Sequence, residues 1–202
     1  MGSNEELLME LIFASNNQHK IDEIQAIAGS KFVLKSLNEI GCYDEIPETG
    51  ATFVENAGQK SHFIYEHYQA DCFGDDSGLE IDSLNGEPGV YSAHYSGSRD
   101  FEKNMQLVLD KLLGMPDRKA RFKTVISLIL QGKEYLFEGS VEGMITEEKS
   151  GIQGFGYDPI FIPEGYDITF AEMHAYEKNR ISHRAKAVQK MIDFLQGRKS
   201  EV

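Results

Sequence analysis

Strand-like and helix-like hydrophobic patterns alternate along the first half of the chain. The run LIFAS (11–15) is typical of a short buried strand. In the segment 20–29, isoleucines recur on one helical face, and the closing glycine is typical of a helix end. A second helix is predicted over 52–68, where Thr52 and Glu55 have the spacing of a capping box. Its predicted core-facing stripe comprises Val54, Ala57, Ser61, Ile64 and Tyr68.

The pattern changes in the second half of the chain. Two short strands are predicted over 70–74 and 79–82, separated by the sequence DDSG. A helix is predicted over 101–113, and a longer strand over 120–130 leads through QGK into an antiparallel partner. The last helix is predicted over 183–196, with Ser182 as its N-cap and a glycine after it. Strands that alternate with helices and then form a hairpin predict an α/β fold with a mixed sheet.

Length and composition indicate one domain in a reducing compartment. The 202 residues can bury a substantial core, and we expect a single domain over 11–198. It follows an N-terminal extension (1–10) whose first letters, MGS, are typical of a cloning remnant. No apolar run approaches the ~20 residues of a membrane span. The two cysteines form no disulfide framework, so we expect a cytoplasmic protein.

The net charge of −13 limits the possible ligands. Nucleic acids and membrane surfaces bind clustered Lys and Arg, so both are disfavoured as partners. A small anionic substrate stays compatible with this charge only if local cations or a metal ion offset the repulsion.

The sequence SNNQHK (15–20) stands between the first strand and its helix. Backbone N–H groups at a helix N-terminus attract phosphate, and Lys20 adds a positive charge there. Asn16 and Asn17 tolerate tight turns and can donate hydrogen bonds. A plain strand-to-helix turn with an asparagine cap explains the same residues.

Acidic residues lie near two predicted element ends. Asp75 and Asp76 follow a short apolar run, which suits either a solvated turn or a carboxylate centre for a metal ion. Glu48 precedes the second helix, where it is either a solvated loop acid or a further metal ligand. Asn56 and Lys60 share one face of that helix.

Two further stretches combine aromatic rings and cations. Phe155 and Tyr157 stand among glycines, where rings either stack on a nucleobase or pack on the core. His183 and Arg184 fall in the first turn of the last helix, a place where cations are unfavourable against the helix dipole. A bound anion or an electron-rich oxygen would offset this cost.

Taken together, these stretches resemble the inosine triphosphate pyrophosphatase family. The matching sequences are SNNQHK, ETGATFVENAGQK, DDSGLEIDSLNGEPGVYSAHYSG, GFGYDPIF and TFAEMHAYEKNRISHRAKA, in the family's order from about residue 11 to 196. The resemblance implies Mg²⁺-dependent hydrolysis of purine nucleoside triphosphates with deaminated bases (ITP, dITP, XTP) to the monophosphate and pyrophosphate. It also implies an elongated two-lobed α/β fold, with a long mixed sheet flanked by helices and the active site in the cleft, and a homodimer. Mn²⁺ is a possible substitute for Mg²⁺.

The resemblance also assigns roles to individual residues. It implies that Asp76 binds Mg²⁺ and acts as the base, that Glu48 is a further metal ligand, and that Lys20 and Lys60 reach the triphosphate as catalytic cations. Asp75 is expected to support Asp76. The implied substrate-binding residues are Ser15, Asn16, Asn17, Gln18, His19, Lys20, Ser77, Phe155, Gly156, Tyr157, Asp158, Lys178, His183 and Arg184.

The chain departs from the family pattern at two positions. His94 stands where an arginine commonly follows YSA, and Ala185 replaces a common glycine after SHR. Two other functions stay open from the residues alone: a nucleotide-sensing module without turnover, and a general Mg²⁺-dependent phosphatase.

Overall fold

A six-stranded mixed sheet organises the protein, whose computed structural model describes residues 9–199. The strand order is β2-β1-β3-β4-β5-β6. The strands are β1 (Glu10–Phe13), β2 (Val33–Lys35), β3 (Cys72–Ile81), β4 (Lys119–Leu130), β5 (Lys133–Ile145) and β6 (Phe161–Pro163). β1 pairs in parallel with β2 and β3, and the remaining neighbours are antiparallel. The predicted α/β fold with a mixed sheet is confirmed.

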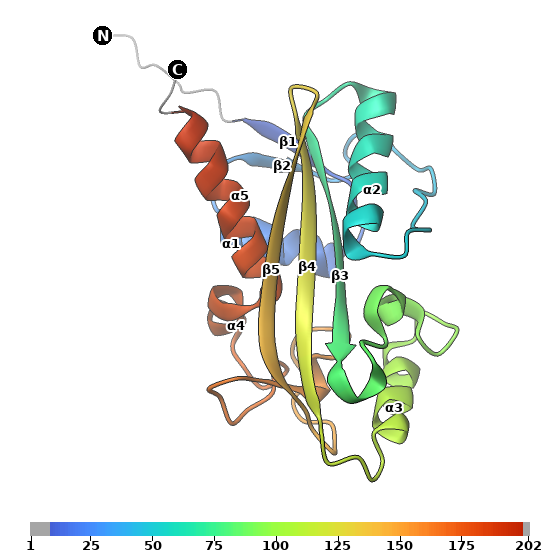
Figure 1. Cartoon of the computed structure of the whole chain (residues 1–202). Coiled ribbons are helices and arrows are strands. Elements are labelled where there is room, and N and C mark those ends of the chain that lie inside the picture. The colour runs from blue at the N-terminus through green and yellow to red at the C-terminus, as the bar shows by residue number, and fades with distance from the viewer. Residues whose placement is uncertain (1–8, 200–202) are drawn as a thin grey trace.

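Helices cover the sheet on both sides. They are α1 (Gln18–Ala28), α2 (Phe53–Tyr68), α3 (Phe101–Lys111), α4 (Ala175–Ile181) and α5 (His183–Lys199), with 3-10 turns η1 (Asp82–Leu84), η2 (Gly89–His94) and η3 (Asp158–Ile160). α2 and α5 lie on opposite sides of the long β3, β4 and β5 strands, and α3 lies near the far end of β3 (Figure 1). Within residues 9–199, none of the helices has the length and apolar character of a membrane span.

Two large apolar clusters form the core at the two ends of the long strands. One joins β1, α1 and α5 around the stacked rings of Phe13 and Phe73. The other joins the far ends of β3 and β4 to α3 and the segment after β5, around Phe122 and Phe161. Polar and charged side chains near the middle of β3 are therefore buried between the two apolar clusters.

The structure confirms most predicted elements and corrects some of their details. Thr52 caps α2 in a complete capping box with Glu55, as predicted. Val54 was predicted to face the core, but it is 43% exposed, whereas Phe53 is buried. Phe53 lies four residues before Ala57, so it continues the stripe that the helix buries.

The structure also corrects the predicted boundaries of the first strand and the last helix. α5 continues through the predicted stop to Lys199. The predicted N-terminal extension (1–10) ends inside β1, because Glu10 pairs with Val33; residues 1–8 lie outside the described part of the chain.

The predicted pair of strands with a DDSG turn between them is wrong. β3 is one continuous strand, and every residue from Cys72 to Ile81 pairs with β4, including Asp75 opposite Ile126 and Asp76 opposite Val125. Asp, Ser and Gly favour turns, but strand preference depends strongly on cross-strand and tertiary partners. Here the cross-strand pairing and the cations beside each carboxylate outweigh the local turn preference.

Candidate active site

The continuous strand separates the two carboxylates. Successive side chains of a strand point to opposite faces of the sheet, so Asp75 and Asp76 face different helices. Asp75 is 1% exposed and Asp76 is 8% exposed, so both carboxylates need partners within the protein. The two faces hold different groups.

The Asp76 face of β3 packs on α2. Asn56 donates from Nδ2 to Asp76 Oδ2 over 3.0 Å. Lys60 donates from Nζ to the Asp75 carbonyl oxygen at 2.7 Å, forms an ion pair with Glu48, and lies 3.9 Å from Asp76 Oδ1. The Lys60 ammonium therefore lies beside the two carboxylates that were predicted as metal ligands.

Glycines on β3 allow α2 to approach this closely. A Cβ at Gly74 would come within 2.6 Å of the Ala57 carbonyl oxygen and 2.8 Å of Lys60 Cβ. A Cβ at Gly78, on the other side of Asp76, would come within 2.4 Å of the Gly89 carbonyl oxygen. Asp76 is thus the side chain that this face presents between two positions where only glycine fits.

The Asp75 face of β3 meets α1 and α5. Lys20 Nζ donates to Asp75 Oδ1 at 2.7 Å, and Ser77 Oγ donates to Oδ2 at 3.0 Å. Arg184 Nε lies 3.6 Å from the same Oδ2. Asp75 thus links the first turn of α1 to the first turn of α5.

The loop before α1 is organised by its own side chains. Asn17 caps the helix by accepting from the Lys20 backbone N–H, and Ser15 Oγ accepts from the Asn17 backbone N–H. Asn16 accepts from the Asn38 backbone N–H, and Gln18 donates to Asp22. This holds Lys20 at the start of α1 with its ammonium directed at β3.

A second cluster of charges joins α1 to α4 and α5. Lys178 Nζ lies 2.7 Å from both Glu23 Oε1 and Asp158 Oδ2. Arg184 forms an ion pair with the other Glu23 oxygen and donates from Nη2 to Ser77 Oγ at 3.3 Å. Glu23 was missed by sequence reasoning, because nothing local marks an acid on the exposed-looking face of a helix as the partner of cations 155 and 161 residues away.

The aromatic residues of the glycine-rich loop divide between site and core. Phe155 stacks on His19 with ring centroids 5.1 Å apart, and Lys178 Nζ lies 5.2 Å from the Phe155 ring centroid. Tyr157 is buried in the core and donates to the Ser92 carbonyl oxygen. Gly156, between them, has a positive φ of 65° that allows this split. Of the two predicted rings, Phe155 is the one that the structure brings to the site.

Burial and neighbouring charges shift the pKa values of the acids in opposite directions. Burial opposes ionisation of Asp75, but the charges of Lys20, Arg184 and Lys60 outweigh it and lower its pKa below the ordinary range. Burial raises the pKa of Asp76, and the nearby Lys60 and Asn56 only partly offset this. Of the two adjacent carboxyls, Asp76 is therefore the better proton acceptor.

The cations of the site are shifted in the same way. Burial lowers the pKa of Lys20, against the attraction of Asp75. The pKa of Lys60 is raised, because Asp75, Glu48 and Asp76 outweigh the effect of its burial. Burial, followed by repulsion from Arg184 and Lys178, lowers the pKa of His183 well below its usual value, so the imidazole is neutral at neutral pH.

Two buried nitrogen atoms stand out near the start of α5. Among the described residues, His183 Nδ1 and Arg184 Nε have no hydrogen-bond partner. Buried polar atoms without partners are costly, and a ligand with suitable acceptors or donors would satisfy them. The His183 ring itself is fixed by stacking on Phe122 at a centroid distance of 4.7 Å.

The two departures from the family pattern lie in different surroundings. His94 is exposed and packs edge-on against Tyr91, with ring centroids 5.9 Å apart. Ala185 is buried, and its backbone N–H donates to Ser182 Oγ, which caps α5 as the sequence predicts. An alanine is therefore accommodated at this position without strain in the helix.

Asp76 and Glu48 are suitable ligands for a hard divalent cation. Both carboxylates lie beside the Lys60 ammonium, so this place already attracts positive charge. No group of three or more His, Cys, Asp or Glu side chains is arranged for a metal ion in the part of the chain that the structure describes. Two carboxylates, with the remaining ligands from substrate phosphates and water, suit Mg²⁺.

Comparisons with known proteins match the chain to the Ham1 family and to dITP/XTP pyrophosphatases. The model of the Ham1 family matches residues 11–194. A dITP/XTP pyrophosphatase from Flavobacterium johnsoniae is 51% identical over 93% of this chain and 98% of its own length, and one from Bacillus subtilis is 44% identical over 94% and 98%. The structure of the Staphylococcus aureus Ham1 protein matches with a TM-score of 0.86 and 40% identity over 94% of this chain and 99% of that one. A HAM1 protein from Coxiella burnetii also matches with a TM-score of 0.86, at 36% identity over 94% and 100%.

Proposed function

Because the chain belongs to the Ham1 family, we propose that it is a dITP/XTP pyrophosphatase. It hydrolyses deaminated purine nucleoside triphosphates to the monophosphate and pyrophosphate, and so removes them from the nucleotide pool. The observation that carries the proposal is the division of β3 into two faces. Asp76 lies with Glu48 and Lys60 on one face, and Asp75 holds Lys20 and Arg184 on the other.

We assign the binding and hydrolysis of the triphosphate to the residues around Asp76. Asp76 and Glu48 would hold Mg²⁺ (or Mn²⁺), which when bound neutralises phosphate charge and makes a bound water more acidic. Lys20 and Lys60 stabilise the charge on the leaving pyrophosphate. Asp76, with its raised pKa, orients the attacking water and accepts its proton. The loop Ser15–Lys20 and the Ser77 hydroxyl contact the triphosphate.

We assign recognition of the purine base to the cluster of side chains around Lys178. Inosine and xanthine carry a 6-oxo acceptor where adenine carries a 6-amino donor. Lys178, neutral His183 and Arg184 supply donors, which would face another donor if adenine were bound. Sites that hydrogen-bond a substrate group discriminate strongly, because a wrong partner leaves buried groups unpaired. Phe155 supplies a ring face for stacking, and Gly156, Tyr157 and Asp158 shape the loop that carries it.

The proposal extends to the arrangement of the lobes and to the oligomeric state. We propose that the two core clusters mark two lobes of one domain over 11–198 with the nucleotide in the cleft between them, and that the active form is a cytoplasmic homodimer. In this arrangement the purine lies toward Phe155 and the triphosphate toward Lys20 and Lys60.

A substrate panel tests the activity. We expect ITP, dITP and XTP with Mg²⁺ to release pyrophosphate, and ATP to react far more slowly. Release of orthophosphate would indicate a general phosphatase instead. Thermal stabilisation by ITP and Mg²⁺ without any product would indicate a nucleotide-sensing module.

The role of Asp76 has a separate test. Asp76→Asn is expected to lower kcat by at least about 10²-fold with an unchanged circular dichroism spectrum, because it removes both a metal ligand and the base. Asp110→Asn, an exposed position on α3, is the control and should keep full activity. Near-normal turnover of the Asp76 variant would refute the assigned role.

A further inference from the structure

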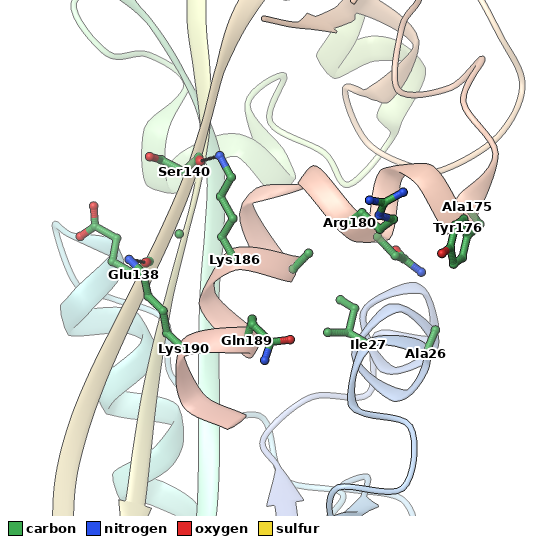
Figure 2. A pocket seen from close by; sticks show the side chains of 13 residues that line it. Ala26, Ile27, Glu138, Ser140, Ala175, Tyr176, Arg180, Lys186, Gln189 and Lys190 are labelled. Carbon is green, nitrogen blue, oxygen red and sulfur yellow. Dashed lines mark hydrogen bonds between the residues drawn. The ribbon is translucent and has the colours of Figure 1, made fainter. Parts of the chain in front are cut away.

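Polar side chains on two helices hold neighbouring strands, but they bond to different groups. On α5, Lys186 and Lys190 donate to carbonyl oxygens of β5, each at 2.7 Å, along one wall of a cavity of about 1170 Å³ (Figure 2). Every strand has backbone carbonyls, so a structural role accounts for these two bonds. On α2, Asn56 instead donates to the carboxylate of Asp76, which is proposed above as a metal ligand and as the base.

Asn56 is a costly residue for its place in α2. It is 4% exposed and lies in the N-terminal part of the helix, on the side that packs against β3. Asparagine is a weaker helix former than alanine or leucine. Burying its amide costs free energy unless the polar atoms are hydrogen-bonded. Both ends of this side chain therefore need partners within the protein.

Both ends of the amide have such a partner. The Gly50 backbone N–H donates to Asn56 Oδ1 at 2.8 Å, and Asn56 Nδ2 donates to Asp76 Oδ2 at 3.0 Å. A backbone N–H can only donate and an ionised carboxylate can only accept, so the two partners together fix which way the amide faces. The side chain thus bridges the loop before α2 and the strand β3.

The bond to Asn56 orients the Asp76 carboxylate. Within residues 9–199, the other hydrogen bond to this carboxylate comes from the Ser77 backbone N–H, which donates to Oδ1 at 3.0 Å. The terminal torsion of an aspartate is broad, so a second bond is needed to fix it. With Oδ2 held by Asn56, Oδ1 lies 3.9 Å from Lys60 Nζ. The same ammonium pairs with Glu48, so Oδ1 is on the side of the other proposed metal ligand.

The loop that carries Glu48 has no helix or strand of its own and is held by side chains of α2. Asn56 binds the Gly50 N–H, and one turn further along Gln59 accepts from the Thr49 N–H at 2.9 Å and donates to Thr49 Oγ1 at 3.1 Å. Gly50 leaves no room for a side chain, because a Cβ there would lie 2.9 Å from Asn56 Oδ1. The backbone next to Glu48 therefore packs directly against the amide.

We propose that Asn56 is a positioning residue for the two proposed metal ligands. Its amide nitrogen sets the orientation of the Asp76 carboxylate, and its amide oxygen holds the loop that carries Glu48. One side chain thus fixes the two acids relative to each other before a divalent cation binds. This inference rests on the proposed function, because it is the metal-dependent reaction that uses the two acids together.

Binding of a non-hydrolysable ITP analogue, with and without Mg²⁺, tests this role. In the unmodified protein, Mg²⁺ should strengthen binding more than about 10²-fold, because the ion replaces repulsion between the triphosphate and the carboxylates by attraction. Asn56→Ala should lower this gain at least about tenfold, as is typical when a residue that orients metal ligands is removed. Its affinity without Mg²⁺ should stay nearly unchanged, because Asn56 acts through the metal ligands. Isothermal titration calorimetry measures all four affinities.

Gln59→Ala is the matched control. It removes two hydrogen bonds between the same helix and the same loop but leaves the bond to Asp76 intact, so it should keep most of the gain from Mg²⁺. Asn56→Ser takes the place of Asn56→Ala if the alanine variant does not fold. Its hydroxyl is too short to reach both partners at once, so the same loss of the gain is expected.

Three results would overturn the role of Asn56: no gain from Mg²⁺ in the unmodified protein, an undiminished gain in Asn56→Ala, or an Asn56→Ala affinity that falls equally with and without Mg²⁺. An equal effect of Gln59→Ala would show that anchoring the loop is sufficient, and would overturn it as well. The titration needs no turnover. Failure of the substrate panel with the expected gains intact would contradict the proposed activity alone. Pyrophosphate release together with an undiminished gain in Asn56→Ala would contradict only the role of Asn56.

Discussion

Asp75 and Asp76 are adjacent in sequence but differ in what their charge does for the folded protein. The charge of Asp75 compensates Lys20 and Arg184, both largely buried, and its pKa is lowered. The pKa of Asp76 is raised, so the fold disfavours its ionised form. One carboxylate therefore stabilises the fold, and the other, which we propose takes part in the reaction, is ionised at some cost in stability.

Replacing each acid by asparagine separates these roles. Asp75→Asn leaves buried cations uncompensated and is expected to lower the free energy of unfolding by about 3–5 kcal/mol. Asp76→Asn is expected to change it by less than about 1 kcal/mol, because the folded state does not favour the lost charge. Urea denaturation of both variants measures this, and equal losses of stability would contradict the division.

His183 gives the stability a specific pH dependence. Its pKa in the folded protein lies well below the value of about 6.5 expected when unfolded, so the unfolded state binds an extra proton below that pH. Stability should therefore fall as the pH decreases from about 6.5 toward the folded pKa, by at most about 1.4 kcal/mol per pH unit. The loss is complete once the pH is below the folded pKa.

A phenylalanine at this position should remove that part of the slope. His183→Phe keeps the stack on Phe122 but cannot take up a proton. Its free energy of unfolding, measured from pH 7 to pH 4.5, should change less than that of the unmodified protein. The exposed His94→Ala variant is the control and should retain the slope; an unchanged slope in His183→Phe would refute the assignment.

At the level of elements, the contact between α2 and β3 positions Lys60 beside Asp76, the two residues that we propose handle the phosphates. Gly74→Ala would place a Cβ 2.6 Å from the Ala57 carbonyl oxygen, which belongs to the helix backbone and cannot move alone. We expect a loss of about 1–3 kcal/mol in stability and lower turnover, because Lys60 shifts with the helix. Thermal unfolding and steady-state kinetics measure the two effects.

Gly58 provides a control on the same helix. A Cβ at Gly58 meets only Glu134 Oε1 at 3.5 Å, which is an ordinary contact. Gly58→Ala should therefore stabilise α2 by about 0.5–1 kcal/mol without changing turnover. If both alanine variants behaved alike, close packing at Gly74 would not be the cause.

Sequence patterns predicted elements where the determining contacts are local. The capping box of Thr52 and Glu55, the Asn17 and Ser182 caps and the hairpin of β4 and β5 all depend on neighbours in sequence or on strand periodicity. The unbroken β3 was not predictable in the same way. Its DDSG segment has the composition of a turn, and it is held in the strand by β4 and by distant cations.

The residues of the site also divide into those that a sequence motif marks and those that only the packing of the helices brings there. The motif positions of Lys20, Lys60 and Asp76 could be carried over from the family resemblance, but the acid that joins Lys178 to Arg184 could not be found from local signals. Glu23 is brought to them by the packing of α1 against α4 and α5. Helix α4 was also not predicted, since its seven residues are too short for a clear helical period.

For the whole molecule, the cations of the site are paired with acidic side chains of the protein itself. Lys20, Lys60, Lys178 and Arg184 each have a carboxylate partner within the protein. The cations are thus neutralised within the protein, so on a chain with a net charge of −13 an anionic nucleotide has to displace these pairs or bind together with a divalent cation. The nucleotide would then contact residues from α1, α2, α4 and α5 at once.

A ligand that contacts all four of these helices should stabilise the whole fold rather than one element. A non-hydrolysable ITP analogue with Mg²⁺, at a hundred times its dissociation constant, should add about 2.7 kcal/mol and raise the unfolding midpoint by about 5–11 °C. The ATP analogue at the same concentration should raise it much less, because its 6-amino group faces the donors of Lys178 and Arg184. Differential scanning calorimetry measures both shifts. Equal shifts would show that the charges of the triphosphate account for all of the binding and that the Lys178 cluster does not read the base.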